Sequence, residues 1–135
     1  MKIVFDTNIL ISAFLTTSGP SEYVFKLGLK RHTVILSEYI IKEFVEKLSE
    51  KFQIPHEKID TAVRFLRNRA VVVQVPANPH LKFSDKKDIP ILALLETMNP
   101  HYFVTGDKKL LEIKKRGGTL FLSLREAMNI LEQSS

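Results

Sequence analysis

The sequence of 135 residues contains no cysteine, and this absence excludes several kinds of chemistry. Disulfide bonds, thiolate zinc sites and cysteine nucleophiles all need the missing side chain. A chain without cysteine is typical of a reducing compartment, so cytoplasm is the expected location. No apolar run reaches membrane-spanning length, and Asp6 interrupts the first one, where a signal peptide would need it unbroken. We therefore expect no membrane association and no targeting segment.

Three nucleotide-handling and hydrolase motifs are also missing. The chain has no Gly-x-Ser-x-Gly elbow, no phosphate-binding loop ending in Gly-Lys-Ser/Thr and no Gly-x-Gly-x-x-Gly fingerprint. Their absence disfavours serine hydrolases, nucleotide triphosphatases and dinucleotide enzymes.

The overall composition is that of one globular domain over residues 1–135, with 44% apolar and 26% charged residues. A net charge of +5 indicates an anionic partner such as a phosphate backbone, although a solvated lysine surface gives the same charge. Five lysines lie close in sequence to the aspartates discussed below, and we expect them to contact RNA. They are Lys82, Lys86, Lys87, Lys108 and Lys109.

Strand-like and helix-like segments alternate along the chain. Strands are expected at 2–5, 32–36, 70–75, 102–105 and 119–122. Helices are expected at 7–15, 22–30, 37–52, 55–68 and 89–98, in a basic stretch from 107 that Gly117-Gly118 would end, and after 123. This alternation predicts an α/β fold with a parallel sheet and helices on both faces.

Aspartates occur where strands give way to helices. Asp6 and Asp107 each end a strand, and Asp85 and Asp88 precede the apolar helix at 89–98. Each alone could be an ordinary helix cap. Together they predict a metal site, because ligands gather at the carboxyl ends of parallel strands and clustered carboxylates need a hard cation. With no activated side-chain nucleophile visible, metal-activated water is the best candidate.

Two choices within this set are open. Asp88 is preferred over Asp85 as a ligand, since one of the two can cap the helix while the other faces the site. Asn8 and Thr105 are candidates for hydrogen bonds that orient Asp6, and Asn8 could instead satisfy backbone groups in the first helical turn.

The order and spacing of these motifs resemble the PIN domain family, whose members include the small VapC-type toxin nucleases. The matching segments are Val4–Leu10, Leu36-Ser37 leading to Glu43, Asp85–Asp88, Thr105–Leu111 and Thr119–Glu126. The resemblance implies a three-layer α/β/α sandwich with a five-stranded parallel sheet in the order 3-2-1-4-5.

The resemblance also implies an activity. Asp6, Glu43, Asp88 and Asp107 fall on the family's acidic quartet, which binds Mg2+ or Mn2+ for phosphodiester hydrolysis. Glu43 rests mainly on this resemblance. Its rivals on the same expected helix are Glu38, Glu46 and Glu50. Lys87 stands where some relatives carry a further acidic residue, which leaves one metal or two open.

The expected function is thus an RNA-cleaving toxin restrained by an antitoxin protein. One alternative is a phosphoryl-transfer enzyme with Asp6 as nucleophile, although haloacid-dehalogenase-like phosphatases carry a second Asp where this chain has Asn8. Another is a PIN-like interaction module without catalysis. The RNA target, the antitoxin and the formation of a homodimer are left open by the sequence.

Overall fold

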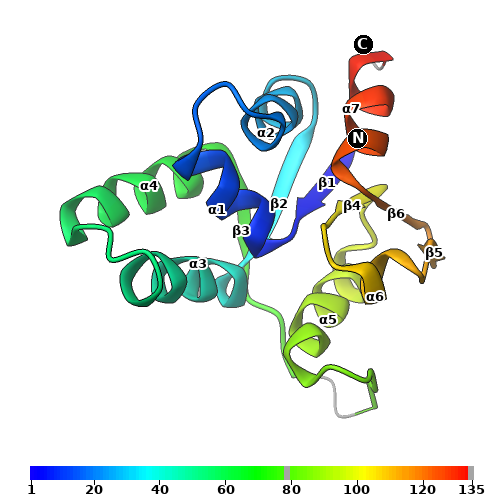
Figure 1. The fold of residues 1–135 in the computed structure, drawn as a ribbon. Coiled ribbons are helices and arrows are strands. Elements are labelled where there is room, and N and C mark those ends of the chain that lie inside the picture. Colours follow the sequence, from blue (N-terminus) through cyan, green and yellow to red (C-terminus); the bar gives the residue numbers. More distant parts are fainter. Residues whose placement is uncertain (78–79, 134–135) are drawn as a thin grey trace.

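The computed structural model describes residues 1–77 and 80–133 and contains a central sheet flanked by helices (Figure 1). The strand order is β3-β2-β1-β4-β6-β5. The five parallel strands are β1 (Lys2–Phe5), β2 (Thr33–Ser37), β3 (Val71–Val73), β4 (Tyr102–Val104) and β6 (Thr119–Leu122). The α/β class and the order 3-2-1-4-5 are confirmed, and the short β5 (Lys115–Arg116) adds an antiparallel sixth strand at the edge.

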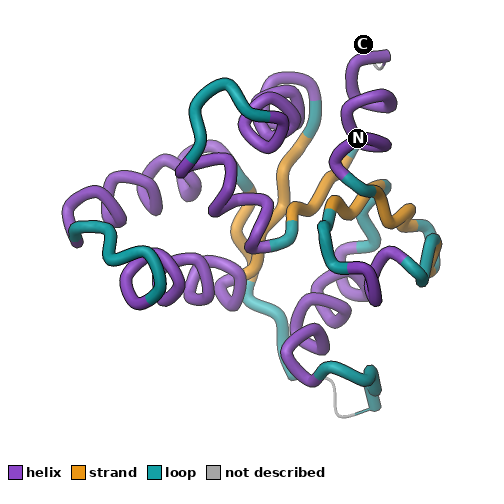
Figure 2. The backbone as a smooth tube through the Cα atoms, in the orientation of Figure 1, coloured by secondary structure: helices purple, strands orange, loops and turns teal. Residues whose placement is uncertain are grey.

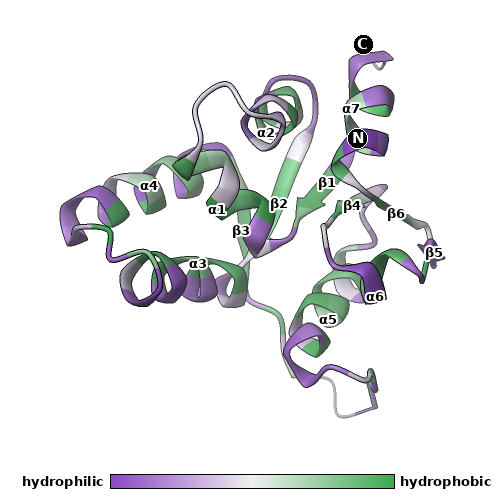
Figure 3. Ribbon diagram, in the orientation of Figure 1, coloured by the Kyte–Doolittle hydropathy of each residue, from purple (hydrophilic) through white to green (hydrophobic). Residues whose placement is uncertain are grey.

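Strand β1 lies at the centre of the sheet, between β2 and β4. Ile3, Val4 and Phe5 are fully buried, as expected for a parallel strand covered on both faces. A side chain at Gly28 of the covering helix α2 (Pro20–Arg31) would lie 2.9 Å from Phe5 Cζ, so glycine permits the close approach. The apolar colouring of β1 and β2 in Figure 3 follows this core.

Helices cover both sides of the sheet. In Figure 1, α1 (Thr7–Leu15), α2, α3 (Glu38–Glu50) and α4 (His56–Arg69) gather on one side, and α5 (Ile89–Met98) lies on the other. The last helix, α7 (Leu124–Gln133), packs against α2. None of the helices in the described residues is long and apolar enough to cross a membrane.

Two expected helix starts have the hydrogen bonds that define them. Ser37 Oγ accepts from the backbone N–H of Ile40 at 3.2 Å, which caps α3. Ser123 and Glu126 form a reciprocal capping box at α7: Glu126 N donates to Ser123 Oγ at 3.2 Å, and Ser123 N donates to Glu126 Oε1 at 3.0 Å.

The expected basic helix after Asp107 is largely wrong. Helix α6 covers only Lys108–Leu111, and the chain then forms the β5–β6 hairpin. Gly117 has φ +59°, a left-handed conformation that suits a hairpin turn, so the glycine pair closes a hairpin and not a helix. Strand β3 is also shorter than expected, and the described residues between it and the short helix η1 (Lys86–Asp88), 74–77 and 80–85, belong to no helix or strand (Figure 2).

Candidate carboxylate site

Asp6 is held where β1 ends and α1 begins. Its Oδ1 accepts the N–H of Thr7 at 2.8 Å, and its Oδ2 accepts the hydroxyl of Thr105 at 2.7 Å. Thr105 Oγ1 in turn accepts the N–H of Asp107 at 3.0 Å. One threonine hydroxyl therefore connects the residues that follow the two central strands β1 and β4, because it donates one hydrogen bond and accepts another.

Burial and hydrogen bonding act in opposite directions on Asp6. Burial raises the pKa of the carboxyl above its ordinary value, and the hydrogen bonds from Thr105 and Thr7 lower it in part. The negative charge of Glu43 raises the pKa further. The net effect is a raised pKa, so the folded protein holds the Asp6 charge at some cost.

Asp88 is buried at the start of α5, with 8% of its surface exposed. It occupies the N-cap position but makes no capping hydrogen bond, and within the described residues its Oδ2 is buried without any hydrogen-bond partner. Burial is the main cause that raises its pKa from 3.8 to about 6, and the charges of Asp107, Asp85, Asp6 and Glu43 add to it in that order. The hydrogen-bonding capacity of Asp88 is therefore less fully used than that of Asp6.

Asp85 differs from Asp88 although the two lie three residues apart. Asp85 is half-buried, and its Oδ1 accepts the N–H of Lys87 at 3.0 Å as the cap of η1. Asp107 also caps a short helix, since its Oδ1 accepts the N–H of Lys109 at 2.9 Å. The choice of Asp88 over Asp85 as a ligand remains a prediction, and the burial of Asp88 supports it.

Glu43 lies on the third helix and contacts the first. Its Oε1 accepts the hydroxyl of Thr7 at 2.5 Å, and Lys47 Nζ lies 3.9 Å from its Oε2. Asn8 is exposed, and its Oδ1 accepts from Lys47 Nζ at 3.1 Å. The expected hydrogen bond from Asn8 to Asp6 is thus replaced by one to Lys47, while Thr105 contacts Asp6 directly.

The rivals of Glu43 have other surroundings. Glu38 forms a two-pronged ion pair with Arg67, at 2.6 and 3.1 Å. Glu46 and Glu50 are exposed, whereas Glu43 is half-buried, although all three line an open hollow of about 360 Å³.

We call Asp6, Glu43, Asp88 and Asp107 the carboxylate cluster. They are electrostatically coupled through Asp88, but the part of the chain that the structure describes contains no group of three or more Asp, Glu or His side chains close enough to hold a metal ion as they stand. The donor chemistry still fits a hard divalent cation: every donor is a carboxylate oxygen, and one buried oxygen of Asp88 has no partner among residues 1–77 and 80–133. A cation there would satisfy that oxygen and offset the mutual repulsion.

All five lysines expected near the site are exposed: Lys82, Lys86, Lys87, Lys108 and Lys109. The structure adds basic residues on α3 that the sequence prediction did not include. Lys42, Lys47 and Lys51 line the 360 Å³ hollow together with Glu43 and Lys87. For Lys47 the available signal was its position four residues after Glu43, the spacing at which two helical side chains meet.

Thr7 and Tyr39 also lie at the site and were missed. Thr7 donates to Glu43, and the hydroxyl of Tyr39 donates to the backbone oxygen of Lys87 at 3.3 Å, which connects α3 to η1. Burial, followed by the negative charges of Glu43 and Asp88, raises the pKa of Tyr39. Neither contact has a signature in the sequence, because each joins segments that are far apart in the chain.

Comparison with known proteins identifies the family. The family model of the PIN domain matches residues 2–109, and the chain belongs to this family. A chain of the VapBC2 structure from Rickettsia felis, bound to a DNA fragment from its promoter, is similar in fold: TM-score 0.66, 16% identity, 91% of this chain and 98% of that chain covered.

A second solved structure is VapC20 of Mycobacterium tuberculosis, a toxin that cleaves the sarcin-ricin loop. Its TM-score is 0.59 at 15% identity, with 78% of this chain and 90% of that chain covered. At these identities the likeness shows the fold. No curated protein matches the chain by sequence.

Proposed function

We propose that this protein is a divalent-metal-dependent endoribonuclease. The buried Asp88 carboxylate carries the proposal, because a raised pKa and an oxygen with no partner among the described residues are expected of a side chain that binds a cation. Membership of the PIN domain family and the fold shared with an RNA-cleaving toxin support the same activity.

In this proposal Asp6, Glu43, Asp88 and Asp107 hold Mg2+ or Mn2+. A bound divalent cation supplies positive charge to the scissile phosphate and makes a water molecule more acidic. Thr105 fixes the orientation of Asp6, and Thr7 fixes that of Glu43. Lys82, Lys86, Lys87, Lys108 and Lys109, with Lys42 and Lys47 of α3, would hold the RNA backbone.

The test is cleavage of end-labelled RNA by the purified protein with Mg2+, with Mn2+ and with excess chelator. We expect metal-dependent products with a 5'-phosphate and a 3'-hydroxyl, from in-line attack by water. RNA binding without turnover would favour the non-catalytic interaction module. A phosphoaspartate trapped at Asp6 would favour the phosphoryl-transfer alternative.

We further propose that the protein is a toxin that cleaves RNA in the cytoplasm, and that an antitoxin protein restrains this activity. The shared fold with a chain of the VapBC2 complex supports this proposal. Expression of the protein alone should arrest growth, and co-expression with the adjacent reading frame should restore it. Harmless expression of a demonstrably active nuclease would instead indicate RNA processing.

A further inference from the structure

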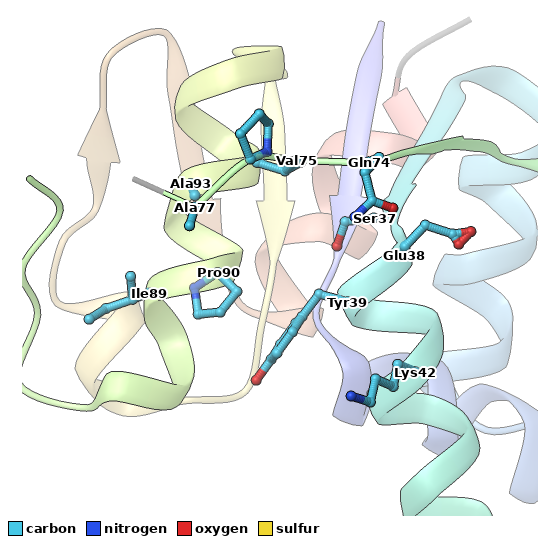
Figure 4. Close-up of a pocket in the computed structure, with 11 residues that line it drawn as sticks. Ser37, Glu38, Tyr39, Lys42, Gln74, Val75, Ala77, Ile89, Pro90 and Ala93 are labelled. Atoms are coloured by element: carbon cyan, nitrogen blue, oxygen red, sulfur yellow. The ribbon is translucent and has the colours of Figure 1, made fainter. Parts of the chain in front are cut away.

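A cavity of about 480 Å³ lies beside the carboxylate cluster, between the first turns of α3 and α5 and the segment that follows β3 (Figure 4). Its walls are mostly apolar. The ring of Tyr39 projects from α3 toward the side of the cavity that Pro90 of α5 forms, and Val75 and Pro76 are among the other lining residues.

The polar residues that line the cavity fall into two groups. Ser37 Oγ is used in capping α3, and the Glu38 carboxylate is paired with Arg67, so neither presents a free charge to an occupant. Lys42 and Gln74 also line the cavity, and no ion pair or hydrogen bond of either side chain is found among the residues 1–77 and 80–133. The available polar chemistry is therefore one cation and one amide.

The cavity shares lining residues with the hollow beside the carboxylate cluster. Tyr39 and Lys42 line both the cavity and the hollow that contains Glu43 and Lys87. Ile89, another lining residue, directly follows Asp88. An RNA strand with a phosphate at the carboxylate cluster would therefore have a neighbouring nucleotide close to the cavity.

We propose that this cavity receives one unstacked nucleobase of the RNA substrate, next to the scissile phosphate. The inference rests on the proposed nuclease function. A base needs a flat face to stack on, which Tyr39 provides, and an edge partner, which the Gln74 amide provides with both donors and an acceptor. Lys42 at the rim meets the attached phosphate. An apolar side chain of a partner protein would contact the apolar walls of the cavity but would leave Lys42 and Gln74 without a polar partner.

The test is a set of RNA substrates with an abasic nucleotide at each position in turn. For the wild-type protein we expect one position, adjacent to the cut, where loss of the base lowers kcat/KM by about tenfold, the scale of one base stacked on an aromatic ring. Ala77→Phe, at an exposed residue lining the cavity, should fill it and abolish this difference between intact and abasic substrate. Thr97→Phe adds the same ring to an exposed residue near the other end of α5 and should leave the difference unchanged.

Two substitutions of Tyr39 separate stacking from folding. Tyr39→Phe keeps the ring and should keep the abasic effect, while Tyr39→Ala should lose it and raise KM more than it lowers kcat. An abasic profile that is uniform along the RNA, or unchanged in Ala77→Phe, overturns the proposal and leaves the cavity to a protein side chain.

Binding distinguishes failure of this inference from failure of the nuclease proposal. In Asp107→Asn, which should not cleave, an RNA with 2-aminopurine at the sensitive position should lose fluorescence on binding, and the additional Tyr39→Ala change should restore it. If the wild-type protein cleaves no RNA, the same probe is scanned along the RNA. Fluorescence quenching that is lost in Tyr39→Ala then supports the base site without catalysis. Quenching that is the same in Tyr39→Ala overturns the base site.

Discussion

Two junctions in this protein place a buried aspartate at the start of a buried helix, and they treat it differently. At the β1–α1 junction, both oxygens of Asp6 accept hydrogen bonds, from Thr7 and Thr105. At the start of α5, Asp88 makes no capping bond, and one oxygen has no partner among the described residues. The first carboxylate is oriented by hydrogen bonds within the protein, while the second has an oxygen that these bonds do not satisfy.

The comparison teaches that burial alone does not indicate a role. A hydrogen-bonded buried charge belongs to the framework of the site, whereas an unsatisfied one has a free-energy cost that a bound cation would remove. The α5 sequence contributes to this cost, because Pro90 in the first turn has no N–H to offer Asp88.

The largest expected effect is on cleavage. Asp88→Asn and Asp6→Asn should each lower kcat by about a thousandfold, since both remove a ligand charge and keep the side-chain shape. Asp60→Asn, at an exposed residue of α4 that pairs with His56, is the matched control and should cleave RNA at the wild-type rate. Full activity in Asp88→Asn would remove that residue from the cation site.

A smaller loss is expected for the fourth carboxylate. Glu43→Gln should lower cleavage by about a hundredfold, whereas Glu38→Gln, which only weakens an exposed pair with Arg67, should be within about twofold of wild type. If Glu38→Gln were the damaging change of the two, the placement of Glu43 in the cluster would be wrong. Initial rates on the same RNA measure both.

Metal binding should stabilise the folded protein. A cation that binds only the native state at some thirty times its Kd adds about 2 kcal/mol, or a rise of roughly 5–10 °C in Tm for a chain of this size. Melts with and without Mn2+ measure this rise. Asp88→Asn should lose most of it, and Asp60→Asn should retain it; an unchanged wild-type Tm at millimolar Mn2+ would contradict the metal site.

The same substitutions should separate the two junctions in the absence of metal. Asp88→Asn removes an unsatisfied buried charge and should raise the free energy of unfolding at pH 8 by about 1 kcal/mol. The free energy of unfolding of Asp6→Asn should not exceed that of wild type, because Thr7 and Thr105 donate to different oxygens of Asp6 and the substitution replaces one of these acceptors with an NH2 group. Denaturant unfolding measures the stabilities of the two variants and of wild type. If Asp6→Asn were more stable than Asp88→Asn, the difference inferred between the two junctions would be wrong.

The smallest effect is a dependence on pH. The folded pKa of Asp88 is raised from 3.8 to about 6, so the folded protein binds this proton more readily than the unfolded chain does. The Asp88 contribution to stability is therefore greatest below about pH 4 and falls as the pH rises through 6. The advantage of metal-free Asp88→Asn over wild type should grow across this range. If the difference in free energy of unfolding between Asp88→Asn and wild type were the same at pH 4.5 and pH 8, the raised pKa of Asp88 would be contradicted.

Sequence patterns predicted helices and strands well where the signal lies within the element itself, as in a helix cap or an apolar run. Ser37 and the Ser123–Glu126 pair marked helix starts, and the apolar run Ile3–Phe5 marked the central strand. The prediction was wrong after Asp107, because pairing of Lys115 and Arg116 with β6 overrides the helical preference of that segment. The assignment of the cluster as metal ligands stays a prediction.

The sequence by itself determined the alternation of strands and helices, the caps and the positions of the acidic residues, because these depend on hydrogen bonds and periodicity within a few residues. Only the tertiary structure decided which side chains meet. The hydrogen bond from Thr105 to Asp6, across 99 residues of sequence, was expected from the motifs, but the bond from Thr7 to Glu43, across 36, was not. The unsatisfied oxygen of Asp88 and the cavity beside Tyr39 are likewise products of packing between distant elements, which no local pattern encodes.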